Sequence, residues 1–178
     1  MKKTAPHRRS RIHSEVVGQS DRACAIVSGS MLEAQLEQLL RKSMIEKPPN
    51  ELFSTYGPLS TFAAKIDIST AMGLISKSER SDLHRIRKIR NIFAHSLEEG
   101  LEFRSSAIHE EIKSLNYCRS KITGLKTSIR VDFESSVAVL VGFLESRTEQ
   151  SIQPKSPPDL KESLWNSRRH DDSDSGTS

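Results

Sequence analysis

Three polar residues near the middle of the chain have the types that a phosphate-cleaving site needs. Arg90, Asn91 and His95 lie close together in one segment of helical pattern. A neutral imidazole can take the proton of a ribose 2′-hydroxyl or return one to the leaving oxygen. A guanidinium can hold the phosphate and offset its developing charge, and an amide can orient either group. This set would need no metal, so the chemistry would be that of a metal-independent endoribonuclease.

The same residues also have a structural explanation. On a helical wheel Arg90 falls between Leu83 and Phe93, inside the apolar arc, where an unpaired guanidinium is costly. A buried carboxylate would then pair with Arg90, and His95 would lie at the helix C-terminus, where a cation is favoured. Because an arginine and a histidine at this spacing are common by chance, both interpretations stay open at this point.

Other catalytic and metal-binding patterns do not fit the sequence. His109 is followed by two glutamates, but position 113 is Lys, so the second histidine of a zinc-binding helix is missing. Cys24 and Cys118 lie far apart and match neither a metal nor a redox spacing. We expect two buried thiols in a reducing compartment, no metal and no cofactor.

The helix that carries the three polar residues has clear boundary signals. Ser76 and Glu79 form a capping box, which predicts a helix that begins at Lys77 and runs to about His95. A preceding helix is predicted from Pro58 to about residue 72, since proline suits the first helical turn. Gly73 can take the left-handed conformation that ends a helix. The pattern therefore predicts two helices joined by a tight turn.

Apolar residues at steps of three and four predict three further helices, over 20–44, about 106–122 and about 131–147. The stretch 46–57 is predicted to be a loop. No strand pattern, glycine-rich phosphate loop or internal repeat is evident. We expect an all-α, single-domain bundle of about five helices, in which short loops make several neighbouring helices antiparallel.

Charge and composition separate the two ends from the body. The 178 residues are 35% hydrophobic and 5% aromatic, which is lean for a fully folded chain. We expect a basic disordered arm over 1–14, a helical domain over 15–150 and a disordered tail over 151–178. Residues 12–150 contain 18 basic and 18 acidic side chains, which argues against a broad duplex-binding face. The longest apolar run, 137–144, is too short to span a membrane.

Three segments resemble the mannitol operon repressor family: 56–66 (YGPLSTFAAKI), 72–76 (MGLIS) and 83–95 (LHRIRKIRNIFAH). The resemblance is specific over about 50–97 and weaker over 20–45 and 105–148. It implies an all-helical regulator of a sugar-alcohol transport operon that acts through protein partners. Members of the family have no recognisable DNA-binding motif, and this sequence also has no recognition helix.

The run from Arg90 to His95 also resembles the HEPN superfamily of helical domains. In that superfamily an arginine, a polar residue and a histidine near a helix end form a metal-independent ribonuclease site, usually across a dimer, and many members are inactive. Carried over, Arg90 and His95 would be catalytic, with Asn91 in a supporting role. Much of the remaining chain has no match to that superfamily.

Taken together, these observations predict a cytoplasmic, repressor-like transcriptional regulator that acts through protein association. We expect a homodimer and a protein partner, and neither sequence-specific DNA binding nor a membrane contact. RNA remains an open ligand, because the alternative is a HEPN-like ribonuclease or toxin that uses Arg90 and His95. Whether the protein is an enzyme is open at this stage.

Overall fold

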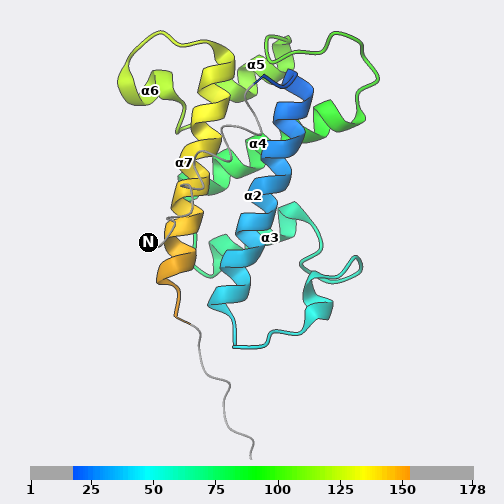
Figure 1. Cartoon of the computed structure of the whole chain (residues 1–178), viewed down its shortest axis with the longest axis vertical. Coiled ribbons are helices and arrows are strands. Elements are labelled where there is room, and N and C mark those ends of the chain that lie inside the picture. The colour runs from blue at the N-terminus through cyan, green and yellow to red at the C-terminus, as the bar shows by residue number, and fades with distance from the viewer. Residues whose placement is uncertain (1–17, 153–178) are drawn as a thin grey trace, which may run out of the picture.

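The computed structural model describes residues 18–152, and all regular structure in this part is helical (Figure 1). The all-α prediction is confirmed for these residues. The predicted arm over 1–14 and nearly all of the predicted tail lie outside them. The elements, in chain order, are α2 (Asp21–Ser43), the 3₁₀-helix η1 (Asn50–Phe53), α3 (Phe62–Ala71), α4 (Lys77–His95), α5 (Ser106–Lys113), α6 (Arg119–Thr123) and α7 (Ile129–Gln150).

The two long helices α2 and α7 lie side by side and run in the same direction (Figure 1). At their beginnings Arg130 donates to Asp21 at 2.8 Å. At their ends the hydroxyl groups of Ser43 and Ser151 lie 3.0 Å apart. Helix α4 packs against α2 and against α5, and α5 in turn packs against α7. It starts near the end of α7 and finishes near the start of α2, where Arg22 donates to the Phe93 carbonyl.

The core lies between α2, α4 and α7. Helix α2 contributes a leucine face, and α4 contributes the predicted apolar arc from Leu83 to Phe93. Phe103, from the loop between α4 and α5, packs edge-on against Phe93 with ring centroids 5.5 Å apart. It also packs against Phe133 of α7 at 4.7 Å. All three rings are fully buried, so Phe103 links α4 to α7 through the core.

Helix α4 begins and ends where the sequence predicts, whereas α3 ends as predicted but begins later. The predicted start at Pro58 is wrong, because the helix begins at Phe62. Thr61 accepts a hydrogen bond from the Ala64 N–H at 3.1 Å and caps the helix. Pro58 instead belongs to the turn in which the Leu59 N–H donates to the Leu52 carbonyl at 2.8 Å. The predicted left-handed Gly73 is confirmed, with φ of 70°.

The single helix predicted over 106–122 is wrong, because the structure has α5 and α6 with a break between them. The cause is Asp82 of α4, whose carboxylate accepts the backbone N–H groups of Asn116 at 2.8 Å and Tyr117 at 3.1 Å. These donors cannot then bond to carbonyls one helical turn earlier. The break is therefore imposed by a residue from a different helix. The predicted last helix is longer than expected, since α7 spans Ile129–Gln150.

The predicted capping box at the start of α4 is present and also ties α4 to α7. Glu79 accepts the Ser76 N–H at 2.6 Å, and Arg147 of α7 donates to its other oxygen at 2.6 Å. Burial opposes ionisation of this carboxyl, but the hydrogen bonds from Arg147 and Ser76 outweigh it. The pKa of Glu79 therefore lies below its ordinary value.

This lowered pKa gives a pH-dependent prediction. A carboxyl whose pKa is lower in the folded than in the unfolded state stabilises the fold above its unfolded pKa. The contribution of Glu79 should be complete at neutral pH and lost as the pH falls below the ordinary value of 4.5. Glu79→Gln should lower the urea midpoint at pH 7. On acidification, the urea midpoint of this variant should then decrease less than that of the parent chain. The exposed Glu149 on α7 supplies the control, and an equal effect of Glu149→Gln would contradict this explanation.

Within residues 18–152, no helix is both long enough and apolar enough to cross a membrane.

Candidate functional site

The three predicted site residues line one open hollow of about 460 Å³ on the surface of α4. Arg90 and Asn91 are half-buried, and His95 is exposed at the last residue of the helix. The opposite wall is the first turn of α3, and Glu33 of α2 also lines the hollow. The sequence therefore indicates correctly that these residues lie together. The wall from α3 and the glutamate from α2 could not be placed from local pattern.

Arg90 has a carboxylate partner from another helix. Its Nη2 donates to an oxygen of Glu33 at 3.0 Å, and both side chains are largely shielded from solvent. Gly29, one helical turn earlier on α2, makes this approach possible. A Cβ at Gly29 would lie 2.9 Å from Cγ of Arg90, which is too close without a shift of the arginine. This small residue therefore positions the guanidinium against α2.

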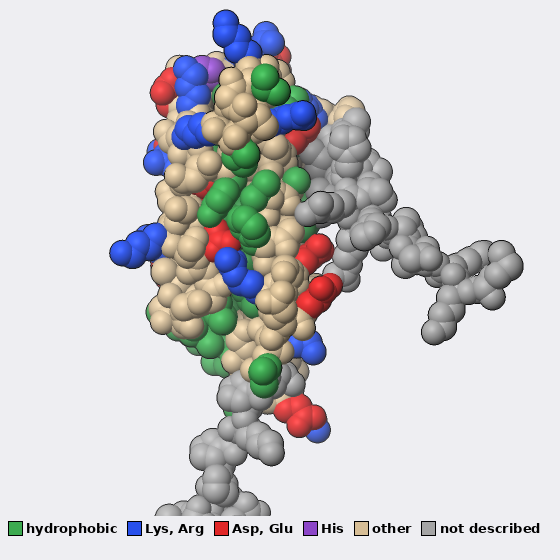
Figure 2. Space-filling model, turned by 90° about the vertical axis from the view of Figure 1, so that its left-hand side faces the viewer, with side chains coloured by type: hydrophobic (Ala, Val, Ile, Leu, Met, Phe, Trp, Pro, Cys, Tyr) green, Lys and Arg blue, Asp and Glu red, His purple; other side chains and the backbone are tan. Residues whose placement is uncertain are grey.

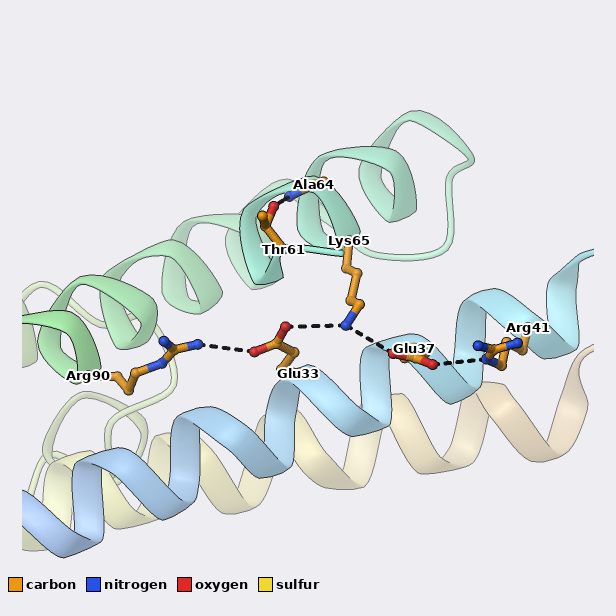
Figure 3. A network of polar contacts seen from close by, with 7 residues as sticks. All are labelled: Glu33, Glu37, Arg41, Thr61, Ala64, Lys65 and Arg90. Carbon is orange, nitrogen blue, oxygen red and sulfur yellow. Dashed lines mark hydrogen bonds and ion pairs between the residues drawn. The ribbon is translucent and has the colours of Figure 1, made fainter. Parts of the chain in front are cut away.

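Glu33 begins a chain of alternating charges that runs across α2 and α3 (Figure 3). Lys65 of α3 lies between Glu33 at 3.2 Å and Glu37 at 2.9 Å, and its side chain is only 6% exposed. Glu37 in turn accepts from Arg41 at 2.9 Å. We call these four residues, together with Arg90, the charge ladder. Glu33, Glu37 and Arg41 recur every four residues, and this spacing is the sequence signal that could have located them.

The charge ladder favours the ionised form of Glu37. Burial opposes the ionisation of Glu37, but hydrogen bonds from Lys65 and Arg41 outweigh it, so its pKa lies below the ordinary value. Arg41 also lies over the Phe53 ring, 3.9 Å from the centroid, which fixes η1 to the end of α2. The ladder thus holds α2, α3 and α4 together beneath the hollow.

A second hollow of about 560 Å³ lies further along α4, towards its start. Its lining is rich in cations. Arg85 and Lys88 donate to Glu111 of α5 at 2.8 and 2.5 Å. Arg80 donates to Asp67 of α3 at 2.7 Å. Arg87 and Asn91 line both hollows, so the two form one continuous surface.

Potential metal ligands and the two cysteines are the other candidate groups for chemistry in this part of the chain. Within the described part of the chain, no three His, Cys, Asp or Glu side chains are arranged to hold a metal ion. Cys24 and Cys118 are buried and not joined to each other. Burial raises the pKa of the Cys24 thiol to about 12, despite the nearby Arg130 guanidinium.

A different face of the molecule carries apolar side chains. Figure 2 shows hydrophobic side chains gathered midway along the side on which α6 and α7 lie. On α7, Phe143 is 40% exposed and stacks edge-on with Tyr117, with ring centroids 5.5 Å apart. Ile122 of α6 and Leu125, just after that helix, are about 60% exposed. An exposed apolar surface of this kind is typical of proteins that associate with other proteins.

Two solved structures share this arrangement of helices. One is MtlR from Escherichia coli, solved as the MtlR–HPr complex. That match has a TM-score of 0.57 and 15% identity, and covers 80% of this chain and 96% of MtlR. The other is YggD, a possible transcriptional regulator from Shigella flexneri, with a TM-score of 0.59 and 13% identity. It covers 83% of this chain and 100% of YggD.

No family model matches this chain, and no curated protein matches it by sequence. At identities of 13–15% the likeness to the two solved structures establishes the fold alone. It confirms the fold expected from the resemblance to mannitol operon repressors.

Proposed function

We propose that this chain is a repressor-like transcriptional regulator that acts by binding another protein, without reading a DNA sequence itself. The observation that carries the proposal is the likeness along almost the whole of MtlR, a protein solved in complex with HPr. The matched region is nearly the entire chain that was solved with that partner. A fold that offers a protein-binding surface in one protein can offer one in another, although the partner itself does not carry over.

Charge also favours protein association over DNA binding. Residues 12–150 have equal numbers of basic and acidic side chains, whereas duplex-binding domains usually have a local excess of cations. Most cations of α4 are already paired with carboxylates from α2, α3 and α5. The exposed apolar side chains around Phe143 add a surface that suits another protein. The proposal includes a homodimer, which light scattering after size exclusion tests directly.

The test of this function combines a DNA selection with an experiment in cells. The purified full chain should enrich no sequence from a random duplex pool at physiological salt. Deleting the gene in its own organism should change the transcripts of a small set of genes. Crosslinking should recover a protein whose own deletion reproduces that change. Salt-resistant binding of the purified chain to one DNA sequence would overturn the proposal, and so would an unchanged transcriptome.

A second candidate function is a HEPN-like ribonuclease, because Arg90, Asn91 and His95 line the same hollow. A substrate phosphate would have to compete with Glu33 for Arg90. Under this hypothesis the chain should cleave a mixed RNA pool with EDTA present. Arg90→Ala and His95→Ala should each reduce the rate by roughly 100-fold or more, as loss of an acid–base group does.

The regulator proposal expects the opposite result, no cleavage by the unmodified chain. His109→Ala, on α5, is the matched histidine control, and all variants must first give the circular dichroism of the parent. Cleavage that is lost in the Arg90 and His95 variants and kept in the His109 variant would establish the ribonuclease. No cleavage by the unmodified chain would reject it.

A further inference from the structure

Arg87 is the arginine of α4 whose charge is not met within the described part of the chain. It is half-buried, and its Nε, like those of Arg85 and Arg90, is shielded from solvent without a hydrogen-bond partner. None of the ion pairs or hydrogen bonds among residues 18–152 involves its side chain. Its neighbours differ, since Arg80, Arg85 and Arg90 each have a carboxylate within 3.0 Å. The half-buried Arg87 side chain therefore carries a positive charge that no described carboxylate neutralises, and an acceptor from outside would stabilise it.

Arg87 lies at the junction of the two hollows. Arg87 and Asn91 line both of them, and the side chain of Asn91 is likewise free of hydrogen bonds to described residues. Six residues at steps of three and four follow the same face of α4 through both hollows: Lys77, Arg80, His84, Arg87, Asn91 and His95. We call this surface the α4 groove. At 1.5 Å per residue it extends for about 27 Å.

We infer that the α4 groove docks an acidic segment of a protein partner, with Arg87 as the anchor for one of its carboxylates. This inference rests on the proposed function and names the chemistry of the partner. A carboxylate pairs with a guanidinium through charge-assisted hydrogen bonds, which are stronger than bonds between neutral groups. Lys77, exposed at one end of the groove, and His95, exposed at the other, can receive further acidic groups.

Carboxylates fit this groove better than a nucleic acid does. Asp67, Glu111 and Glu33 lie along it and would repel an unbroken row of phosphates. Single-stranded nucleic acids are usually held by aromatic rings on which bases stack. The aromatic ring that lines these hollows is Phe62, which is 3% exposed and therefore closed to stacking. Along the groove, Lys77 and Arg87 have no carboxylate partner among the described residues, whereas Arg80 and Arg90 are already paired. This alternation suits a protein segment whose carboxylates are spaced apart.

The experiment measures binding of a short, fluorescein-labelled glutamate-rich peptide to the full chain by fluorescence anisotropy. A uridine oligonucleotide of equal charge is measured in parallel. The peptide should bind, and Arg87→Glu should weaken it by about tenfold or more, since a charge-assisted pair becomes a repulsion. Lys126→Glu makes the same charge change at an exposed residue between α6 and α7, outside both hollows, and should change the affinity by less than about twofold.

A second measurement separates docking from a structural role. Arg87→Gln should leave the urea midpoint unchanged or raise it, because no bond within the described chain is lost. A clear fall in that midpoint would overturn the inference. So would the absence of peptide binding, equal losses in the Arg87 and Lys126 variants, or a tighter, Arg87-dependent binding of the oligonucleotide.

The groove and the regulatory function can fail separately. If the partner recovered by crosslinking binds the Arg87→Glu variant with the affinity it has for the parent chain, the inferred docking in the α4 groove is wrong. The proposed regulatory function is then unaffected. If the peptide binds and Arg87→Glu weakens it as expected, but gene deletion leaves the transcripts unchanged, the proposed function is wrong. The inferred binding of acidic segments to the α4 groove is then retained.

Discussion

Replacing Asp82 by alanine should lower the free energy of unfolding by about 3–5 kcal/mol, since three hydrogen bonds to one buried carboxylate would be lost together. Asp82 is fully buried in α4. Its carboxylate accepts the backbone N–H of Asn116 at 2.8 Å, the N–H of Tyr117 at 3.1 Å and the side-chain amide of Asn116 at 2.7 Å. Urea denaturation followed by far-ultraviolet circular dichroism measures the loss.

Two further variants make this prediction specific. Asp82→Asn keeps the shape and one acceptor oxygen, so it should cost less than Asp82→Ala. Asp67→Ala removes an exposed carboxylate that pairs with Arg80, and it should cost less than about 1 kcal/mol. Equal losses for Asp67→Ala and Asp82→Ala would contradict the role given to the buried carboxylate. An increase in helical signal in Asp82→Ala would show that this carboxylate keeps α5 and α6 apart.

Replacing Lys65 by methionine should give the second largest polar effect, a loss of about 2–3 kcal/mol at pH 7. Removing one partner of a buried ion pair is strongly destabilising, but here the two glutamates are partly exposed and the loss is correspondingly smaller. Methionine keeps most of the apolar length of lysine, so the change isolates the cation between Glu33 and Glu37. Urea midpoints at pH 7 measure it, with Lys42→Met on an exposed part of α2 as the control.

The pH dependence of this variant provides an independent check. Without Lys65 the pKa of Glu37 should rise towards its ordinary value of 4.5, because a hydrogen bond and a cation are lost. The difference in stability between the parent and Lys65→Met should therefore shrink as the pH falls below that value. A difference that stays constant on acidification would contradict the electrostatic explanation and point to packing.

The parts of the fold that the sequence predicts well are those with local causes. The start of α4 depends on Ser76 and Glu79, three residues apart, and its turn from α3 depends on Gly73. Two local signals, Pro58 and Thr61, could each mark the start of α3. The helix begins after Thr61, whose hydroxyl accepts a hydrogen bond from the Ala64 N–H. The break between α5 and α6 depends on Asp82, in a different helix, so no local pattern predicts it.

The candidate site divides in the same way. Arg90, Asn91 and His95 share one helix, so their proximity follows from spacing alone. The carboxylate that meets Arg90 comes from α2 and the lysine beside it from α3, and their meeting depends on how the helices cross. The unpaired state of Arg87 is harder still to anticipate. It results from where the carboxylates of three other helices fall along α4.

The parallel pairing of α2 with α7 also determines when this protein can fold during its synthesis. The leucine face of α2 leaves the ribosome early, but its long partner is the last helix of the described chain. At roughly 5–20 residues per second, the ribosome needs on the order of 5–20 s to add 44–150. Throughout that interval the nascent chain carries an incomplete core that chaperones can bind. A polypeptide that stops before Ile129 should therefore be degraded rather than accumulate as a shorter, folded protein.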